Sequence, residues 1–209
     1  LAAAPDSSRA AVATHDGRLL LVDIASGEVR EVVSGANAHV TNLAFSPDSA
    51  WLAWSHPGPT PLRHIKMVNA SDLSVVDVTP LRFADFAPSF TEDGKYLAFL
   101  SIRTFDPVYD AHVFDLSFPT GCRPHLVPLA ATTPSPFAPM HGGRPVGDDD
   151  KDSDDEDEKA SVTRVDVEGL ADRVVPVPVA AAEYVSLKAA RGGLLWLRRP
   201  LLGVLGDNL

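Results

Sequence analysis

Cysteine is nearly absent from this chain of 209 residues, in which Cys122 is the single example. One cysteine cannot form an internal disulfide, so the fold does not need an oxidising compartment and a cytoplasmic location is expected. No stretch approaches the roughly 20 uninterrupted apolar residues that span a bilayer. The first residues, Leu1–Ser8, lack the basic and apolar regions of a signal peptide. The chain begins with leucine and directly in strand-like sequence, so we expect a segment of a longer protein.

Clustered basic charge is also missing. The chain has 18 lysines and arginines against 28 acidic residues, a net charge of −10. Nucleic acids and anionic membranes bind clusters of Lys and Arg, so neither is expected as a partner. Much of the acidity lies in residues 148–159, which hold nine carboxylates and two lysines. This acidic loop cannot pack into a core and is expected to be solvated. Whether it attracts cations or a partner stays open.

Motifs for catalysis and for metal binding are missing as well. The sequence contains no Gly-x-Ser-x-Gly nucleophile turn, no His-Glu-x-x-His and no Cys-x-x-Cys. Alternate acids in the run at 148–154 resemble an EF-hand loop, but the turn glycine is absent and Ser161 replaces the closing glutamate. No catalytic residue, metal site or cofactor is therefore predicted. Four histidines are interpreted as surface or loop side chains: His56, His64, His125 and His141.

What the chain does contain is a repeat of about 45 residues. Phe45–Trp54 aligns without a gap on Phe90–Phe99, at an offset of 45. A second marker, an apolar residue followed by Asp or Asn, is expected to close an apolar strand and recurs at a spacing of 46, at Val22–Asp23, Val68–Asn69 and Phe114–Asp115. A period of 40 to 50 residues is typical of β-propeller blades. The 18 prolines and 14 glycines also favour short strands and turns.

The predicted fold class is therefore all-β, with β-propeller blades of four antiparallel strands. About four blades or part-blades are expected, which makes a partial propeller. The units are placed near 1–37, 38–82, 83–125 and 162–200, with a proline-rich and acidic insertion at 119–160. Asp48 and Asp93 occupy equivalent hairpins, where aspartate bonds its own backbone, so they are interpreted as turn formers.

Arg103 is the one candidate for contact with a substrate. It follows the strand-like run Tyr96–Leu100, where its side chain would face the pore of a propeller. A guanidinium group suits a peptide carboxylate or an acidic side chain. The alternative is that Arg103 pairs with Asp106 or Asp110 and holds the loop in place.

Several stretches resemble the middle propeller of the tricorn family of serine peptidases. Ser46–Asp48 and Thr91–Ser101 are similar to a blade repeat that this family shares with TolB-type propellers. The stretches that follow resemble tricorn in order and spacing: Ser101–Asp110, Phe114–Phe118, Pro124–Leu129 and Val165–Val179, with Tyr184 after them. The likeness covers most of positions 43–200, and the acidic run at 148–159 departs from it.

The resemblance implies a non-catalytic propeller segment of a cytoplasmic, homohexameric peptidase. Its serine nucleophile would lie outside these residues, and the propeller would support the access of peptide substrates. The segment alone is then not an enzyme, although its parent hydrolyses peptides. Two alternatives stay open: a TolB-like propeller that binds a protein, and a prolyl-oligopeptidase-type propeller, which would need an α/β-hydrolase domain in the same chain.

Overall fold

A computed structural model describes residues 1–35, 38–110, 114–137, 140–141, 144–145 and 162–200. The predicted all-β fold class is confirmed, because antiparallel β-sheets form nearly all of the regular structure. Within these ranges the one helical element is a single 3₁₀ turn, η1 (Leu170–Arg173). No helix in this part of the chain is long and apolar enough to cross a membrane.

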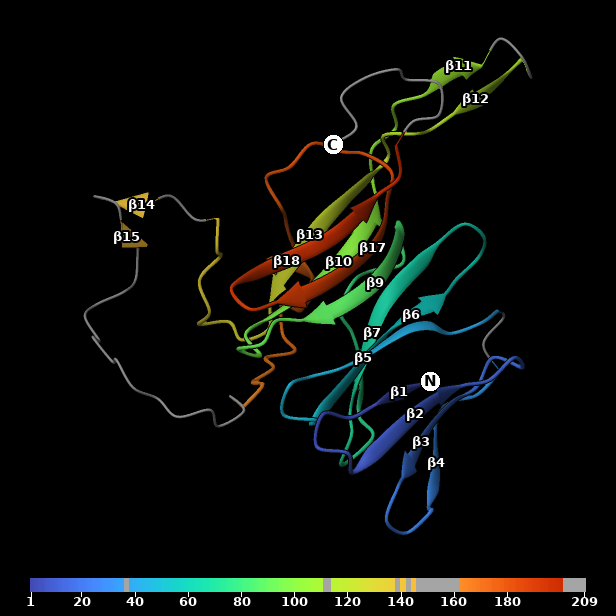
Figure 1. The fold of residues 1–209 in the computed structure, drawn as a ribbon, viewed down its shortest axis with the longest axis vertical. Coiled ribbons are helices and arrows are strands. Elements are labelled where there is room, and N and C mark those ends of the chain that lie inside the picture. Colours follow the sequence, from blue (N-terminus) through green and yellow to red (C-terminus); the bar gives the residue numbers. More distant parts are fainter. Residues whose placement is uncertain (36–37, 111–113, 138–139, 142–143, 146–161, 201–209) are drawn as a thin grey trace.

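Three four-stranded blades follow one another along the chain (Figure 1). Blade 1 comprises β1 (Ala2–Ala3), β2 (Arg9–Ala13), β3 (Leu19–Asp23) and β4 (Val29–Val33). Blade 2 comprises β5 (Thr41–Phe45), β6 (Trp51–Pro57), β7 (Arg63–Asn69) and β8 (Val75–Asp77). Blade 3 comprises β9 (Ala84–Phe90), β10 (Tyr96–Ile102), β13 (Cys122–Pro128) and β16 (Val175–Pro176). A single parallel residue pair, Arg63 with Ala84, joins blade 2 to blade 3.

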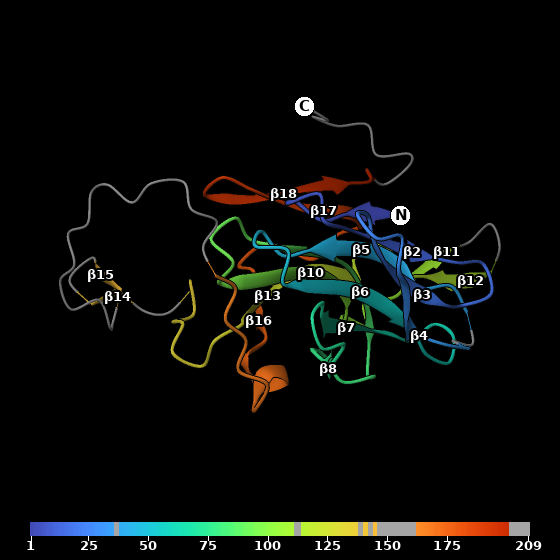
Figure 2. The same ribbon diagram turned by 90° about the horizontal axis from the view of Figure 1, so that it is seen from below.

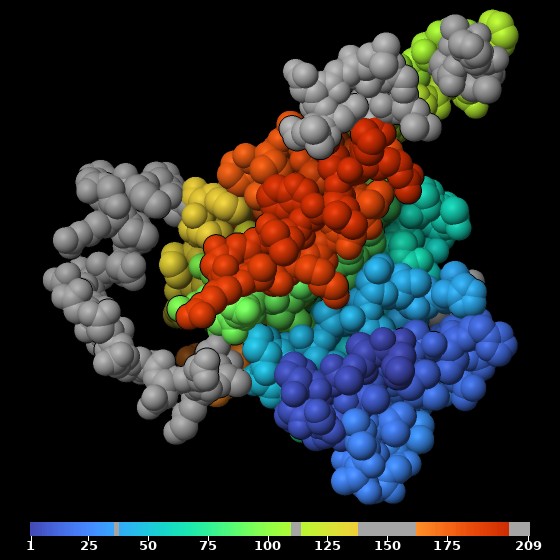
Figure 3. Space-filling view, in the orientation of Figure 1, coloured from blue at the N-terminus to red at the C-terminus, as the bar shows by residue number. Residues whose placement is uncertain are grey.

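Three two-stranded hairpins complete the described structure. The hairpin of β17 (Tyr184–Ala190) and β18 (Gly193–Arg198) packs beside blade 3. Two smaller hairpins lie between strands of the blades, β11 (Val108–Asp110) with β12 (Asp115–Ser117) and β14 (Met140–His141) with β15 (Arg144–Pro145). Figure 3 shows that the β11–β12 hairpin stands clear of the body of the molecule.

The first strands of successive units lie side by side. β5 packs against β9, and β9 packs against β17. Figure 2 shows β5 and β17 toward one side of the molecule and β8 and η1 toward the other. We call β5, β9 and β17 the inner strands, because this radial order places them closest to the axis of a propeller.

Strands in the middle of the blades are buried on both faces. Successive side chains of a strand point to opposite faces, so β6 supplies Leu52 and Trp54 to one core and Ala53 to another. In the same way, successive side chains of β10 pack alternately into the cores on its two sides. Each fully buried large apolar side chain contributes about 1.5–3 kcal/mol, and these cores hold neighbouring blades together.

The repeated aspartates form equivalent turns, which confirms the interpretation of Asp48 and Asp93. In each turn the carboxylate accepts the backbone N–H two residues on, at 3.2 Å from Ala50 and 3.0 Å from Lys95. Asp6 makes the same bond in blade 1, at 2.9 Å. The residue after each aspartate has a left-handed backbone: Ser7, Ser49 and Gly94, with φ of 60°, 61° and 65°.

The second marker is confirmed in two of its three copies. Asp23 and Asn69 begin the same turn, in which their N–H groups bond Glu28 O at 2.9 Å and Ser74 O at 3.0 Å. The third copy, Phe114–Asp115, is wrong, because Phe114 lies in the connection between β11 and β12 and Asp115 begins β12. The backbone bond after the marker, Ala70 N to Ala50 O, recurs as Leu129 N to Lys95 O. The structurally equivalent position in blade 3 is therefore Val127–Pro128, where proline replaces Asp or Asn and the inserted hairpin has changed the spacing.

The excursion lies within blade 3, between β13 and β16, and it begins later than the sequence suggested. β13 lies inside the stretch interpreted as a connection, and its prolines do not prevent it from pairing along its whole length with β10. On the far side of the excursion, β16 pairs with β13. The chain that returns from the excursion is anchored at Thr163, whose N–H donates to Asp48 Oδ2 at 2.6 Å. The acidic loop, 148–159, lies outside the described residues.

The turn between β17 and β18 gives a matched pair of glycines. Gly192 has a φ of 71°, Gly193 has no left-handed φ, and a Cβ at either position would meet nothing within 4 Å. A left-handed backbone costs an L-residue about 1–2 kcal/mol. We therefore expect Gly192→Ala to lower the free energy of unfolding by about 1 kcal/mol, whereas Gly193→Ala leaves it unchanged or raises it by about 0.5 kcal/mol. Urea unfolding of both variants tests this, and equal losses would contradict it.

Candidate functional site

Each inner strand carries a β-bulge at a corresponding place. In β5 the register with β6 shifts between Thr41 and Ala44, which leaves Asn42 and Leu43 as the bulge. In β9 the register with β10 shifts around Ala87 and Pro88, and in β17 it shifts at Val185. Asn42 and Ala87 have left-handed backbones, with φ of 56° and 51°. A bulge leaves a residue unpaired in the ladder, so its backbone groups are available to another partner.

The three bulges converge on one groove. It has a volume of about 80 Å³ and is lined by residues 42–43 of β5, 87–88 of β9 and 185–188 of β17. We call it the bulge groove. Its lining carries one charged side chain, that of Lys188. Three segments far apart in the sequence thus bring small, uncharged surface and irregular backbone together.

A larger pocket continues from the bulge groove toward the end of the strands. It has a volume of about 350 Å³, and three aromatic side chains line it: Phe86, Phe118 and Tyr184. We call it the Phe118 pocket. Val185 lines both hollows, so they adjoin at this residue of β17. The acid at its edge, Glu183, is paired with Arg199 at 2.6 Å.

Arg103 lies on the other face of blade 3 and lines neither hollow. Its Nη2 is 3.6 Å from Oδ1 of the fully buried Asp85, and its Nε donates to Ser101 Oγ at 2.7 Å. The guanidinium carbon is 4.7 Å from the centre of the Phe83 ring. These contacts hold Arg103, although 27% of its side chain remains exposed. Its contact with a passing peptide stays a prediction.

The partner expected for Arg103 was wrong where the structure describes it. Asp106 accepts a hydrogen bond from Thr120 at 2.9 Å, and the side chain of Asp110 lies outside the described structure. Asp85 takes the place of Asp106. Nothing in the local sequence identifies it, because Asp85 comes from the preceding strand and meets Arg103 only when β9 and β10 pair.

The Asp85 contact continues into blade 2 through a buried serine. Ser55 Oγ donates to the backbone oxygen of Asp85 at 2.8 Å and accepts from Arg63 Nε at 2.8 Å. Arg63 also donates to His39 O at 3.0 Å, and burial lowers its pKa. Both blades are thus tied together at the end where the Arg63–Ala84 bridge lies.

All four histidines lie in strands, and the interpretation as surface or loop residues was wrong for His64 and His125, which are buried, and for His56, which is partly buried. His56 and His64 are opposite each other on β6 and β7, with ring centres 5.3 Å apart. His125 is buried in β13 and stacks on Phe99 at 5.7 Å. Packed sheets on both sides remove these rings from water, which the local sequence did not reveal. His141 lies in β14, and its side chain is outside the described structure.

Burial favours the neutral form of His56, His64 and His125, because it lowers the pKa of each. It lowers the pKa of His125 to about 4, and it also lowers the pKa of His56 to about 4. Among the described residues no serine, threonine or cysteine side chain is hydrogen-bonded to a histidine ring, and no group of acids, histidines and cysteines could hold a metal ion. Burial raises the pKa of the Cys122 thiol to about 11, so it is not a thiolate at neutral pH.

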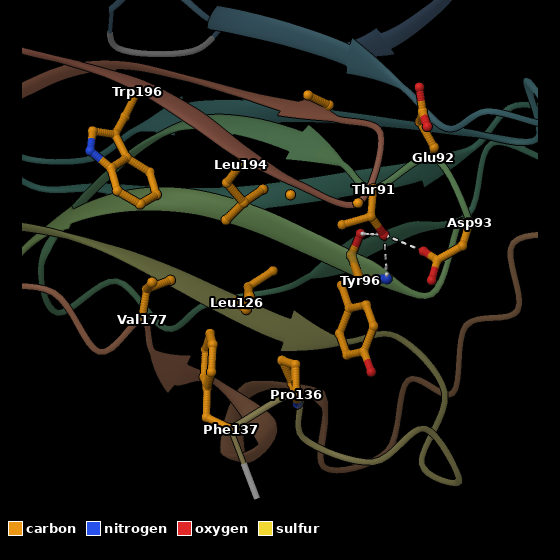
Figure 4. A pocket seen from close by; sticks show the side chains of 13 residues that line it. Thr91, Glu92, Asp93, Tyr96, Leu126, Pro136, Phe137, Val177, Leu194 and Trp196 are labelled. Carbon is orange, nitrogen blue, oxygen red and sulfur yellow. Dashed lines mark hydrogen bonds between the residues drawn. The ribbon is translucent and has the colours of Figure 1, made fainter. Parts of the chain in front are cut away.

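The pocket in Figure 4 is wider and more apolar. It has a volume of about 590 Å³ and lies where the outer part of blade 3 faces β18, with Tyr96, Leu126, Leu194 and Trp196 in its lining. The polar groups beside it bond one another, since Thr91 Oγ1 donates to Asp93 at 2.6 Å and accepts from Tyr96 N at 3.1 Å. This arrangement suits packing against another sheet and offers no reactive group.

Comparison with known proteins agrees with this architecture. A family model described as the tricorn protease second β-propeller domain matches residues 1–208. The chain is 62% identical over 208 residues to tricorn protease homolog 1 of Streptomyces coelicolor, covering 100% of the chain and 20% of that protein. It is 53% identical to the putative tricorn protease homolog 2 of the same organism, over 85% of the chain and 16% of that protein.

Among solved structures, the crystal structure of the tricorn protease matches with a TM-score of 0.79 and 22% identity, over 96% of this chain and 19% of that one. This match shows the fold. The chain spans about a fifth of the length of these proteins.

The buried histidine predicts a pH dependence of stability. Between pH 4 and 6.5 the unfolded chain protonates His125 whereas the folded chain does not, so lowering the pH through this window favours unfolding. A shift of this size in a buried group corresponds to about 3 kcal/mol. We expect His125→Phe, which keeps a ring against Phe99, to make the free energy of unfolding less dependent on pH in this window. Urea unfolding of both proteins at several pH values between 4 and 6.5 tests this prediction. An unchanged slope of the free energy of unfolding against pH in the variant would contradict it.

Proposed function

Because the chain belongs to the family of tricorn protease second β-propeller domains, we propose that it supports the passage of peptide substrates to a catalytic domain outside these residues. The observation that carries this proposal is the bulge groove, which three inner strands build together and which continues into the Phe118 pocket. The parent is then a serine peptidase, and the present chain contributes a passage to it.

The lining of the bulge groove suits the passage of peptides of many different sequences. Its lining combines bulged backbone with small side chains at Ala87 and Ser186. Backbone N–H and C=O groups bond the main chain of any extended peptide, because every residue carries the same groups. A surface of this kind holds a peptide loosely, without selecting its side chains. That suits a passage better than a tight binding site.

The chemistry of the described residues supports placing the catalytic step elsewhere. The histidines with a lowered pKa are buried, and burial leaves the Cys122 thiol protonated. A cytoplasmic, homohexameric parent is a part of the proposal that depends on the family resemblance alone. The repeat of about 45 residues supports a further part, that units near 1–37, 38–82, 83–125 and 162–200 together form a partial propeller.

A protein-binding role is the second candidate, and the β11–β12 hairpin favours it. Large apolar side chains on and beside this hairpin are exposed, among them Phe105 at 80%, Tyr109 at 60% and Phe114 at 79%. Contiguous exposed apolar surface marks interaction sites. The hairpin stands away from the inner strands, so binding there and passage along the groove are compatible.

A tryptophan placed in the groove tests the proposed passage. In the full-length protein that contains this chain, we expect Ser186→Trp to fill the bulge groove and to lower kcat/KM for a decapeptide by about tenfold, a change of about 1.4 kcal/mol. Val167→Trp is the control, because Val167 is 54% exposed and lines neither hollow. Hydrolysis is followed by mass spectrometry.

Two outcomes would contradict the proposal. Full-length protein that hydrolyses no peptide would remove the peptidase assignment. Normal peptide hydrolysis by a folded Ser186→Trp variant would remove the passage along the bulge groove.

A further inference from the structure

Ser101 lies at the centre of a polar row on the face of blade 3 that turns toward blade 2. In the strand register it is opposite Asp85 on β9 and opposite Arg123 on β13. Residues directly opposite one another in antiparallel strands share a face. Arg103 joins the same face, since its Nε bonds Ser101 Oγ at 2.7 Å. Two guanidinium groups therefore lie on one face with a single carboxylate.

The charges in this row do not balance. Asp85 forms its ion pair with Arg103, at 3.6 Å. No carboxylate among the described residues pairs with Arg123, and the Nε of Arg123 is buried without a hydrogen-bond partner. The second oxygen of Asp85, Oδ2, is likewise buried and unbonded. Buried donors of this kind are normally satisfied, so Arg123 points to a missing anion.

The described groups around the row do not supply that anion. On the same strand, His125 is neutral, and burial followed by the charge of Arg103 lowers its pKa. From the facing blade, Arg63 reaches the row through Ser55 and adds a third positive charge. The excess of positive charge is notable in a chain whose net charge is −10.

The row is also close to the proposed route of the peptide. Arg103 N donates to Gly121 O at 3.1 Å, and Gly121 lines the Phe118 pocket. The Arg103 side chain is 27% exposed, so the row is accessible from solvent at Arg103.

We propose that Arg103 and Arg123 form a binding site for a peptide carboxylate, either the C-terminal group or an acidic side chain. This inference rests on the proposed passage of peptides. A guanidinium presents paired N–H donors that match the two oxygens of a carboxylate. Asp85 orients Arg103 and neutralises part of the positive charge, so the site holds a carboxylate weakly enough to release it.

Three fluorescein-labelled hexapeptides test the site. The first has a free C-terminal carboxylate and no acidic side chain, the second is its C-terminal amide, and the third is the amide with one glutamate. The full-length protein is first treated with a serine-directed inhibitor so that the peptides stay intact, and binding is followed by fluorescence anisotropy. We expect the free-acid peptide to bind about tenfold more tightly than the amide. Binding of the glutamate peptide distinguishes a C-terminal site from one that also takes acidic side chains.

Two variants of Arg123 and one control complete the experiment. Arg123→Gln is expected to abolish the tenfold preference, and Arg123→Lys to lose most of it, because an ammonium group lacks the paired donors. Arg82→Gln is the control, since Arg82 is an exposed arginine outside the row, and it should keep the preference. Circular dichroism checks that each variant folds.

The outcomes separate this inference from the function on which it rests. Equal binding of the free acid and the amide to the unmodified protein would overturn the carboxylate site and leave the passage intact. An undiminished preference in Arg123→Gln, or in Arg123→Lys if the first variant does not fold, would also overturn it. If none of the peptides binds, the proposed passage itself fails.

Discussion

Burial of the middle strands on both faces is the constraint on which the rest of this structure depends. β6 and β10 lie between neighbouring sheets, so most side chains along them must fit one core or the other. Polar groups on these faces need partners inside the protein. Ser55 on β6 meets this need by bonding Asp85 O of blade 3, and two other buried serines also bond the backbone of a neighbouring sheet, Ser49 with Asp6 N of blade 1 and Ser89 with Ala189 N of β17. The apolar cores supply the attraction, and these bonds fix the relative position of the sheets.

The repeat could be read from the sequence because its turns are local. Asp48 and Asp93 bond backbone groups two residues away, so a short stretch of sequence contains the whole interaction. The same holds for the turns that begin at Asp23 and Asn69. Where an inserted hairpin lengthened one unit, a fixed spacing placed the third marker at Phe114–Asp115 and missed Val127–Pro128.

The candidate site was largely hidden from the sequence, because its members come from different strands. Asp85 meets Arg103, and Asn42 meets Val185, only after the sheets have formed and packed. The left-handed backbone at Ala87 has no compositional signal, although Pro88 beside it is a residue that interrupts strand pairing. The histidines show the same difficulty, since their burial is decided by blades that lie on either side of them.

The anchoring of the long excursion has a consequence for how this protein tolerates change. Ala131 N donates to Asp166 Oδ2 at 2.8 Å, and Thr163 is bonded to Asp48, so both ends are fixed to the blades near its base. The entropy of closing a flexible loop grows only slowly with its length. Lineages are therefore free to lengthen or shorten this segment with little effect on the blades, and an engineer could splice a reporter domain into it.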